Sequence, residues 1–452
     1  MLRPLCAALL LCAAVIPAAA QVPDALSGRW SGAAIYDGTV PTLFSLEIGV
    51  LGPDSLTTTL TQPYAGFDRF RFPFAYEAGR LDGELVGGLY GDEMRLLVDL
   101  ASQTLRGTVV ADGDTTATVY LQRVMDYALP GYRIEDVAFQ AGEATIAGSL
   151  LVPEAPGPHP AAVLVPGRGY GSTRARMASY ARLLARDGIA ALVYDARGTG
   201  GSTGTDTLTT GAERAQDVGA ALDALLARSD IRADAVGVLS YSAGGWVAPL
   251  ALDGRDDVAF WVSLAGPTTN LVEQQGVAVE QYVARYLPDL SDAEGQAAGD
   301  YQRRLTALAI ADAPWRDIAP LVAAAREATW AEAVDLPVAA DDANLNYYRL
   351  RASFDPEAAL RRLAVPTLAV YGSEDWIVPP TPHADRLRAL AAESGHADVT
   401  VVVLDGAEHS LGRPGAVVPG AWPLGYARRW TRPPELYPTI VDWIQARTGL
   451  SD

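Results

Sequence analysis

Short runs in which hydrophobic and polar residues alternate dominate the chain between residues 24 and 125. Turn signals such as Gly-Asp, Pro-Asp and Asp-Gly separate these runs, a pattern typical of strands with one buried face. We expect strands at residues 45–50, 80–86, 94–100, 104–110 and 115–121. The segment 21–125 is therefore predicted to be a small, separate all-β domain, either a barrel or a sandwich.

After residue 126 the pattern changes to continuous apolar runs that alternate with segments of helical periodicity. Two strands are expected at 132–140 and 143–152, and buried strands at 161–165, 189–194, 235–239, 258–264, 366–371 and 399–404. Helices are expected at 174–187, 211–228, 246–252, 381–394 and 435–448. This alternation predicts an α/β domain over residues 126–452, with a mostly parallel sheet covered by helices on both faces. Ligands bind such sheets at the carboxyl ends of the strands.

Residues 268–360 interrupt this alternation. They are rich in Ala, Glu and Arg at helical spacing, with helices expected at 273–286, 293–311 and 318–333 and no clear strand. We interpret the segment as a helical insertion that forms a cap over the ligand site.

The first 20 residues have the features of a secretory signal peptide. A short basic start precedes an apolar run at 5–16, and small residues at 18–20 precede a cleavage point. We therefore expect export to the periplasm or the extracellular space. No later run approaches about 20 uninterrupted apolar residues, so we expect no integral membrane segment. Both cysteines, Cys6 and Cys12, lie in this signal, and a lipid anchor on Cys12 is disfavoured by the large Leu11 before it.

Composition excludes several kinds of chemistry. All 35 basic residues are arginines, so Schiff bases, pyridoxal phosphate attachment and a P-loop lysine are excluded. Without the signal, the chain contains no cysteine for a disulfide, a thiolate metal site or a cysteine nucleophile. The formal net charge of -19 argues against nucleic acid as a partner, because that binding depends on neutralising phosphates.

Residues 237–246 read Gly-Val-Leu-Ser-Tyr-Ser-Ala-Gly-Gly-Trp, which predicts a strand, a tight turn and a helix. A serine at the apex of such a turn has a strained backbone, and tiny neighbouring side chains are needed to accommodate it. Ser242 is therefore the candidate nucleophile. Ser240 stands where the G-x-S-x-G motif has its first glycine.

A serine nucleophile needs a base, and the chain has four histidines. We interpret His159, His383 and His396 as surface or capping residues. His409 follows the strand expected at 399–404, so a loop would place it at the carboxyl edge of the sheet. It is the preferred base, with His383 as the alternative.

The base in turn needs an acid that fixes its tautomer. Asp375 lies three residues after Gly372, which ends the strand expected at 366–371. This position selects Asp375 over its neighbour Glu374, which we interpret as solvated.

Two N–H groups are expected to stabilise a developing oxyanion. One is the backbone N–H of Ala243, directly after the candidate nucleophile. The other is assigned to Arg168, in the glycine-rich loop at 166–171 that follows a buried strand. The spacing of this loop fits neither dinucleotide nor P-loop patterns.

These features together resemble the α/β-hydrolase superfamily over about residues 132–450: nucleophile, acid and histidine occur in that order, each after its own strand. Residues 194–202 resemble the D-x-R-G-x-G-x-S loop of that superfamily, and 372–379 resemble its acid loop. The chain is most similar to exported bacterial hydrolases of the serine aminopeptidase-like or dienelactone hydrolase-like groups. It departs from the pattern at Ser240 and at Pro166, where a histidine commonly opens the oxyanion loop.

The resemblance implies an α/β-hydrolase fold with an eight-stranded, mostly parallel sheet, a helical cap and a separate N-terminal β domain. It implies a serine hydrolase that needs no metal or organic cofactor and cleaves a carboxylic ester of a small or medium acyl compound. An aminopeptidase acting on short peptides and a thioesterase are the enzymatic alternatives, and a non-catalytic binding protein is the alternative of another class. Residues 28–32 loosely resemble the opening strand of lipocalin-like barrels.

A peptidase would need a carboxylate for the substrate amine. The sequence offers four candidates in the cap, Glu273, Glu280, Asp341 and Asp342. Trp330, Tyr347 and Tyr348 are candidates for an apolar pocket lining.

Overall fold

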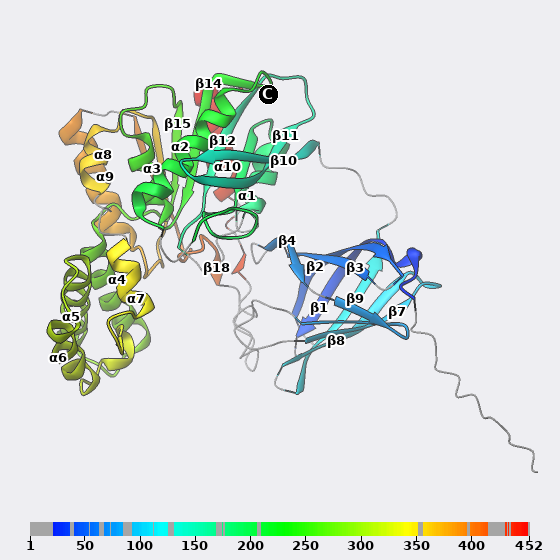
Figure 1. Cartoon of the computed structure of the whole chain (residues 1–452), viewed down its shortest axis with the longest axis horizontal. Helices are drawn as coiled ribbons and strands as arrows, with labels where there is room; N and C mark the ends of the chain where they lie inside the picture. Colours follow the sequence, from blue (N-terminus) through cyan, green and yellow to red (C-terminus); the bar gives the residue numbers. More distant parts are fainter. Residues whose placement is uncertain are drawn as a thin grey trace, which may run out of the picture. The chain divides into compact units, whose positions relative to one another are not determined.

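The structure of the chain is a computed structural model that describes residues 21–36, 40–53, 55–62, 67–72, 74–84, 93–111, 113–124, 131–168, 174, 177–205, 209–350, 356–395, 398–414, 430–431, 433 and 435–450. The predicted signal peptide and His396 lie outside the described residues. The chain divides into two compact units, one holding the N-terminal sheet and one holding the α/β sheet (Figure 1). Each is described by itself.

The first unit is an all-β sheet of nine described strands in the order β4-β3-β2-β1-β9-β8-β7-β6-β5. The strands are β1 (Gly28–Tyr36), β2 (Val40–Gly52), β3 (Ser55–Gln62), β4 (Phe67–Phe72), β5 (Phe74–Glu77), β6 (Arg80–Glu84), β7 (Glu93–Asp99), β8 (Thr104–Ala111) and β9 (Asp114–Arg123). Alternate residues enter its core: Trp30 pairs with Leu46 across β1 and β2, and both are fully buried. The buried Trp30 indole N–H donates to the carbonyl of Leu26 in the short helix η1 (Asp24–Leu26), at 3.0 Å.

The second unit contains a sheet of eight described strands in the order β10-β11-β13-β12-β14-β15-β16-β17. The strands are β10 (Tyr132–Ala141), β11 (Ala144–Pro153), β12 (His159–Val165), β13 (Ala190–Tyr194), β14 (Ile231–Tyr241), β15 (Phe260–Leu264), β16 (Thr367–Gly372) and β17 (Val399–Leu404). The β10–β11 and β11–β13 pairs are antiparallel, and the pairs from β13 to β17 are parallel. The carboxyl ends of the parallel strands therefore meet at one edge.

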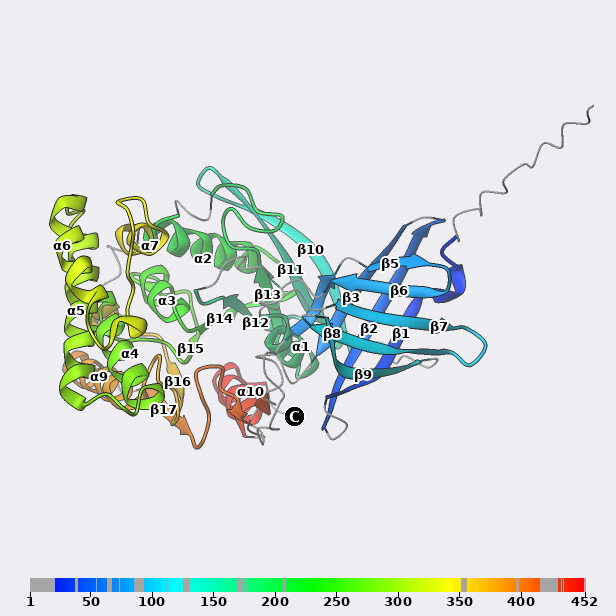
Figure 2. The same ribbon diagram turned by 90° about the horizontal axis from the view of Figure 1, so that it is seen from below.

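Helices cover both faces of this sheet (Figure 2). On one face lie α1 (Ala178–Arg186) and α10 (Leu436–Thr448), and on the other α2 (Gly211–Leu226), α3 (Gly244–Leu252) and α9 (Pro380–Ser394). The continuous burial of β12, β13, β15 and β16 follows from this double coverage. Helix α1 begins at Ala178, after the start expected at residue 174. The Arg174 backbone N–H and guanidinium both bind Asp195.

The insertion between β15 and β16 is helical in its described part, and all of its helices except the last gather at one end of the unit (Figure 1). It consists of α4 (Leu271–Tyr286), α5 (Asp292–Ile310), α6 (Trp315–Arg326), η5 (Ala331–Ala333), α7 (Ala343–Leu350) and α8 (Pro356–Arg362). The helix expected over 318–333 ends at Arg326, whose guanidinium donates to the carbonyls of Leu336 and Pro337 as the chain turns back. None of the helices that the structure describes is long and apolar enough to cross a bilayer.

Candidate active site

Ser242 lies at the turn between β14 and α3, with φ of 50°. This is the left-handed region, which costs energy for a residue with a side chain. Backbone hydrogen bonds hold the turn, since the Ser242 N–H donates to the Leu264 carbonyl at 2.8 Å and the Gly245 N–H donates to the Ser242 carbonyl at 2.7 Å. A side chain at Gly244 would meet the Val165 carbonyl oxygen at 2.8 Å, so the turn requires a small residue there.

Ser240 occupies the position of the first glycine in the G-x-S-x-G motif. Its side chain is fully buried at the end of β14, and its hydroxyl accepts a hydrogen bond from the Trp261 indole N–H at 2.9 Å. A buried hydroxyl with a partner carries little penalty. The serine is therefore compatible with the turn.

The structure brings Ser242, His409 and Asp375 into one hydrogen-bonded chain. His409 Nε2 lies 2.8 Å from Ser242 Oγ, and His409 Nδ1 lies 2.8 Å from Asp375 Oδ2. The other carboxylate oxygen, Oδ1, accepts the N–H groups of Ile377 and Val378 at 2.9 and 2.8 Å. The Asp375 side chain is fully buried, whereas that of His409 is 17% exposed. The imidazole can therefore receive a proton from the serine while the carboxylate holds its orientation.

The loops that carry Asp375 and His409 are bonded to each other. The Glu374 N–H donates to the Ala407 carbonyl at 2.9 Å, and the Gly406 N–H donates to the Ser373 hydroxyl at 2.8 Å. Gly372 permits this approach, because a Cβ at this position would lie 2.2 Å from the Ala407 carbonyl oxygen. The spacing of the two side chains is therefore fixed by backbone contacts.

The glycine-rich loop after β12 packs against the Ser242 turn. A Cβ at Gly167 would lie 2.8 Å from the Ser242 Cβ, and the neighbouring residues Arg168 and Ala243 line the same cavity as Ser242. Within the described part of the chain, neither the Arg168 nor the Ala243 backbone N–H has a protein acceptor. The Arg168 guanidinium lies 3.8 Å from the ring centroid of Tyr347 in α7 and donates to Asn344 Oδ1 at 3.3 Å. The assignment of these two N–H groups as oxyanion donors stays a prediction.

A cavity of about 560 Å³ opens onto Ser242 and His409. Apolar side chains line part of it, from α3, α4 and the loop after β16: Trp246, Ala278, Val279, Trp376, Ile377 and Val378. Polar side chains line another part: Arg168, Gln274, Gln302, Glu332 and Asp335. Such a size and mixture suit a small organic molecule held by a few polar contacts.

The four carboxylates that the sequence suggested for a substrate amine do not line this cavity. Glu273 and Glu280 pair with Arg303 of α5 at 3.1 and 2.6 Å, and Asp342 caps the following turn through the Asn344 N–H. Of the aromatic candidates, Tyr347 lines the cavity, Tyr348 is fully buried behind it, and Trp330 packs on Tyr301.

Two acidic residues that sequence reasoning missed, Glu332 and Asp335, do line the cavity. The Asp335 carboxylate accepts hydrogen bonds from Tyr348, Gln302 and Asn344, whereas Glu332 is exposed. Both lie in the connection between α6 and α7, Glu332 in the short helix η5 and Asp335 in the segment that follows it. No local pattern in the sequence marks such a connection as part of a site.

The interpretation of His159 and His383 as surface or capping residues is wrong. Both are buried, at 6% and 1% exposure. His383 Nδ1 accepts the Thr268 N–H at 3.1 Å, which leaves the ring proton on Nε2. Burial lowers the pKa of His383 to about 4. The ring is therefore a neutral part of the core, packed against Thr268.

This burial predicts a pH-dependent stability. Because the unfolded imidazole titrates near about 6.5 and the folded one near about 4, stability is fully present above pH 6.5 and falls between these values. We expect this group to cost about 2 kcal/mol of unfolding free energy between pH 7 and pH 5. In His383→Asn the amide oxygen still accepts the Thr268 N–H but does not titrate, so urea unfolding should show a pH dependence smaller by that amount. An unchanged dependence would contradict this assignment.

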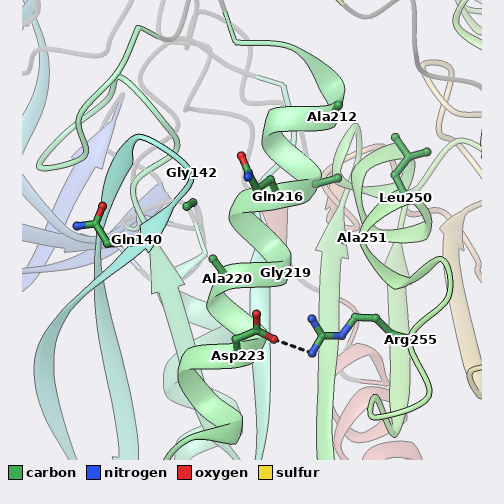
Figure 3. Close-up of a pocket in the computed structure, with 12 residues that line it drawn as sticks. Gln140, Gly142, Ala212, Gln216, Gly219, Ala220, Asp223, Leu250, Ala251 and Arg255 are labelled. Carbon is green, nitrogen blue, oxygen red and sulfur yellow. Dashed lines mark hydrogen bonds and ion pairs between the residues drawn. The ribbon is translucent and has the colours of Figure 1, made fainter.

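A second hollow, of about 690 Å³, lies beside α2 (Figure 3). Small residues of α2 form its floor, and the Asp223 carboxylate in it pairs with Arg255 at 2.8 Å. Neither Ser242 nor His409 lines it, so the chemistry of the site concerns the first cavity alone.

Comparison with known proteins points to one family. Residues 158–413, more than half of the chain, match the family described as "Serine aminopeptidase, S33". None of the curated proteins matches.

Similar solved structures include an esterase of Pyrococcus furiosus, at 16% identity over 72% of this chain and 97% of that one, with a TM-score of 0.44. Another is a puromycin-hydrolyzing peptidase of Mycobacterium tuberculosis, at 14% identity over 90% of this chain and 52% of that one, with a TM-score of 0.47. A 2,6-dihydroxy-pseudo-oxynicotine hydrolase matches at 18% identity over 71% of this chain and 69% of that one, with a TM-score of 0.43. These likenesses are low, so the assignment rests on the sequence match. The chain belongs to the serine aminopeptidase S33 family and is an α/β hydrolase with a helical cap and a separate N-terminal β domain.

Proposed function

We propose that the chain is a serine hydrolase that cleaves a carboxylic ester of a small or medium acyl compound through an acyl-enzyme. The observation that carries the proposal is the hydrogen-bonded series from Ser242 Oγ through His409 to Asp375, with 2.8 Å at each step. The cavity of about 560 Å³ beside Ser242 supports a substrate of that size.

In this mechanism His409 Nε2 takes the hydroxyl proton of Ser242 as Oγ attacks the carbonyl carbon. The backbone N–H groups of Ala243 and Arg168 donate to the oxyanion that forms. His409 then gives the proton to the leaving alcohol as the ester bond breaks. Water, deprotonated by the same imidazole, releases the acid and restores the Ser242 hydroxyl. Asp375 holds the Nδ1–H tautomer throughout.

An aminopeptidase acting on short peptides is the second candidate. Glu332 favours it, because its carboxylate in the lining of the cavity offers a counter-charge to the amino terminus of a substrate. We also propose that the chain is exported through the signal peptide expected at residues 1–20. Export is compatible with an ester substrate and with a peptide substrate.

Turnover of p-nitrophenyl acyl esters of increasing chain length, compared with aminoacyl anilides, separates the two candidates. We expect faster turnover of the short and medium esters, and loss of that activity in Ser242→Ala. Faster turnover of the anilides would replace the ester assignment with the peptidase. Ester turnover that survives in Ser242→Ala would contradict the mechanism.

A further inference from the structure

One arginine of the cap contacts both loops that carry the proposed acid and base. Arg285 lies in the last turn of α4, and its Nη1 donates to the Glu374 carboxylate at 2.9 Å and to the Glu374 carbonyl at 3.2 Å. Its Nη2 lies 3.4 Å from Glu408 Oε1. Glu374 directly precedes Asp375, and Glu408 directly precedes His409.

The two carboxylates that Arg285 contacts differ in burial, and this difference indicates which contact contributes more. The Glu374 side chain is 49% exposed, so its pairing alone is of the surface kind and contributes little. The Glu408 side chain is 9% exposed, and a carboxylate at that depth needs a partner. The guanidinium fork is suited to this position, because two of its nitrogens can engage two carboxylates at fixed angles.

Charge gives a second reason for the bridge. Glu374, Asp375 and Glu408 place three carboxylates in two loops that are in backbone contact. Like charges at such separations repel each other. A cation between Glu374 and Glu408 offsets that repulsion and favours the close approach of the loops that the Asp375–His409 hydrogen bond requires.

We propose that Arg285 is a positioning residue. Through it, cap helix α4 holds the loop that carries Asp375 and the loop that carries His409 at a fixed separation, which maintains the His409–Asp375 hydrogen bond. This inference rests on the proposed function for its effect on turnover. It concerns a residue that does not line the cavity and does not touch the reacting atoms.

The first test is steady-state kinetics of Arg285→Gln on the preferred ester. Because a small displacement of catalytic groups lowers the rate of the chemical step, we expect kcat to fall between about 10-fold and 100-fold with KM within about twofold. Arg285→Lys should recover part of the rate, since an ammonium keeps the charge without the fork. Arg303→Gln is the matched control. Like Arg285, Arg303 pairs with two glutamates, but both of these lie on α4, and Arg303 contacts neither of the two loops.

The second test reads the hydrogen bond without turnover. The Nδ1 proton of His409 is followed by NMR in the full chain with isotopically labelled histidine and is assigned by its loss in His409→Gln. We expect the downfield Nδ1 proton resonance to move upfield or broaden in Arg285→Gln and to persist in Arg303→Gln. In a double-mutant cycle, Arg285→Gln should cost less rate in a Glu408→Gln background than in the wild type.

Three results would overturn the inference: an unchanged resonance with unchanged kcat in Arg285→Gln, an effect on KM alone, or equal effects in Arg303→Gln. Failure of the proposed function would look different. The wild type would then turn over neither esters nor anilides, while the NMR comparison would still report whether Arg285 maintains the His409–Asp375 bond.

Discussion

Replacing Asp375 with Asn is expected to lower kcat by about a thousandfold to ten-thousandfold while leaving the fold intact. The N–H groups of Ile377 and Val378 donate to Asp375 Oδ1, so the amide oxygen of the new side chain must occupy that place. The amide NH₂ then faces His409 Nδ1 and donates to it. His409 is forced to carry its proton on Nε2, where it can no longer accept the proton of Ser242.

The measurement is kcat on the preferred ester, with thermal unfolding followed in parallel. Asp385→Asn is the matched control. Asp385 is 66% exposed and pairs with Arg388, which lies on the same helix, α9. A loss of less than about tenfold in Asp375→Asn would mean that Asp375 does not set the tautomer of the base.

Replacing Asp217 with Ala should produce the largest loss of stability, about 3 to 5 kcal/mol of unfolding free energy. Asp217 Oδ1 lies 2.5 Å from Arg197 Nη2, and both side chains are buried, at 2% and 9% exposure. Burial raises the pKa of Asp217, and the hydrogen bond and the charge of Arg197 oppose that shift. The truncation would leave the guanidinium with the Ala141 carbonyl at 3.0 Å, the Gln216 amide oxygen at 3.4 Å and the Glu213 carboxylate at 3.5 Å as partners.

Urea unfolding tests this prediction, with Asp223→Ala as the control on the same helix. Asp223 also pairs with an arginine, Arg255, but is 69% exposed, so its loss should cost less than about 1 kcal/mol. Equal costs for the two variants would contradict the account of the buried pair. The double replacement Arg197→Met with Asp217→Leu should be less destabilising than Asp217→Ala, because it leaves no unpaired charge.

The geometry around Ser242 could be anticipated because each of its parts follows a strand. In a parallel sheet the carboxyl ends meet at one edge, so the residues just after β14, β16 and β17 come together whatever the details of the helices. The short distances in sequence from Gly372 to Asp375 and from Leu404 to His409 are therefore enough to predict that both side chains lie near Ser242. Gly372 also permits the close contact with Ala407, although its sequence neighbours do not reveal this.

The residues that sequence reasoning missed depend on how distant segments pack. Glu332 and Asp335 reach the cavity because the connection after α6 folds back over it, and Arg285 reaches Glu374 because α4 ends beside the acid loop. Such contacts join residues far apart in the chain and leave no periodic pattern. His383 follows Pro382 in a polar stretch, which favoured a surface position, but its ring faces Thr268 in the core.

Covalent labelling by a fluorophosphonate probe tests whether Ser242 is the nucleophile of a serine hydrolase. We expect one equivalent of probe on the folded chain, located at Ser242 by peptide mass spectrometry. Labelling should be absent in Ser242→Ala and strongly slowed in His409→Gln, because the imidazole activates the hydroxyl. A folded wild-type sample that takes up no probe, or labelling that persists in Ser242→Ala, would rule out Ser242 as the nucleophile.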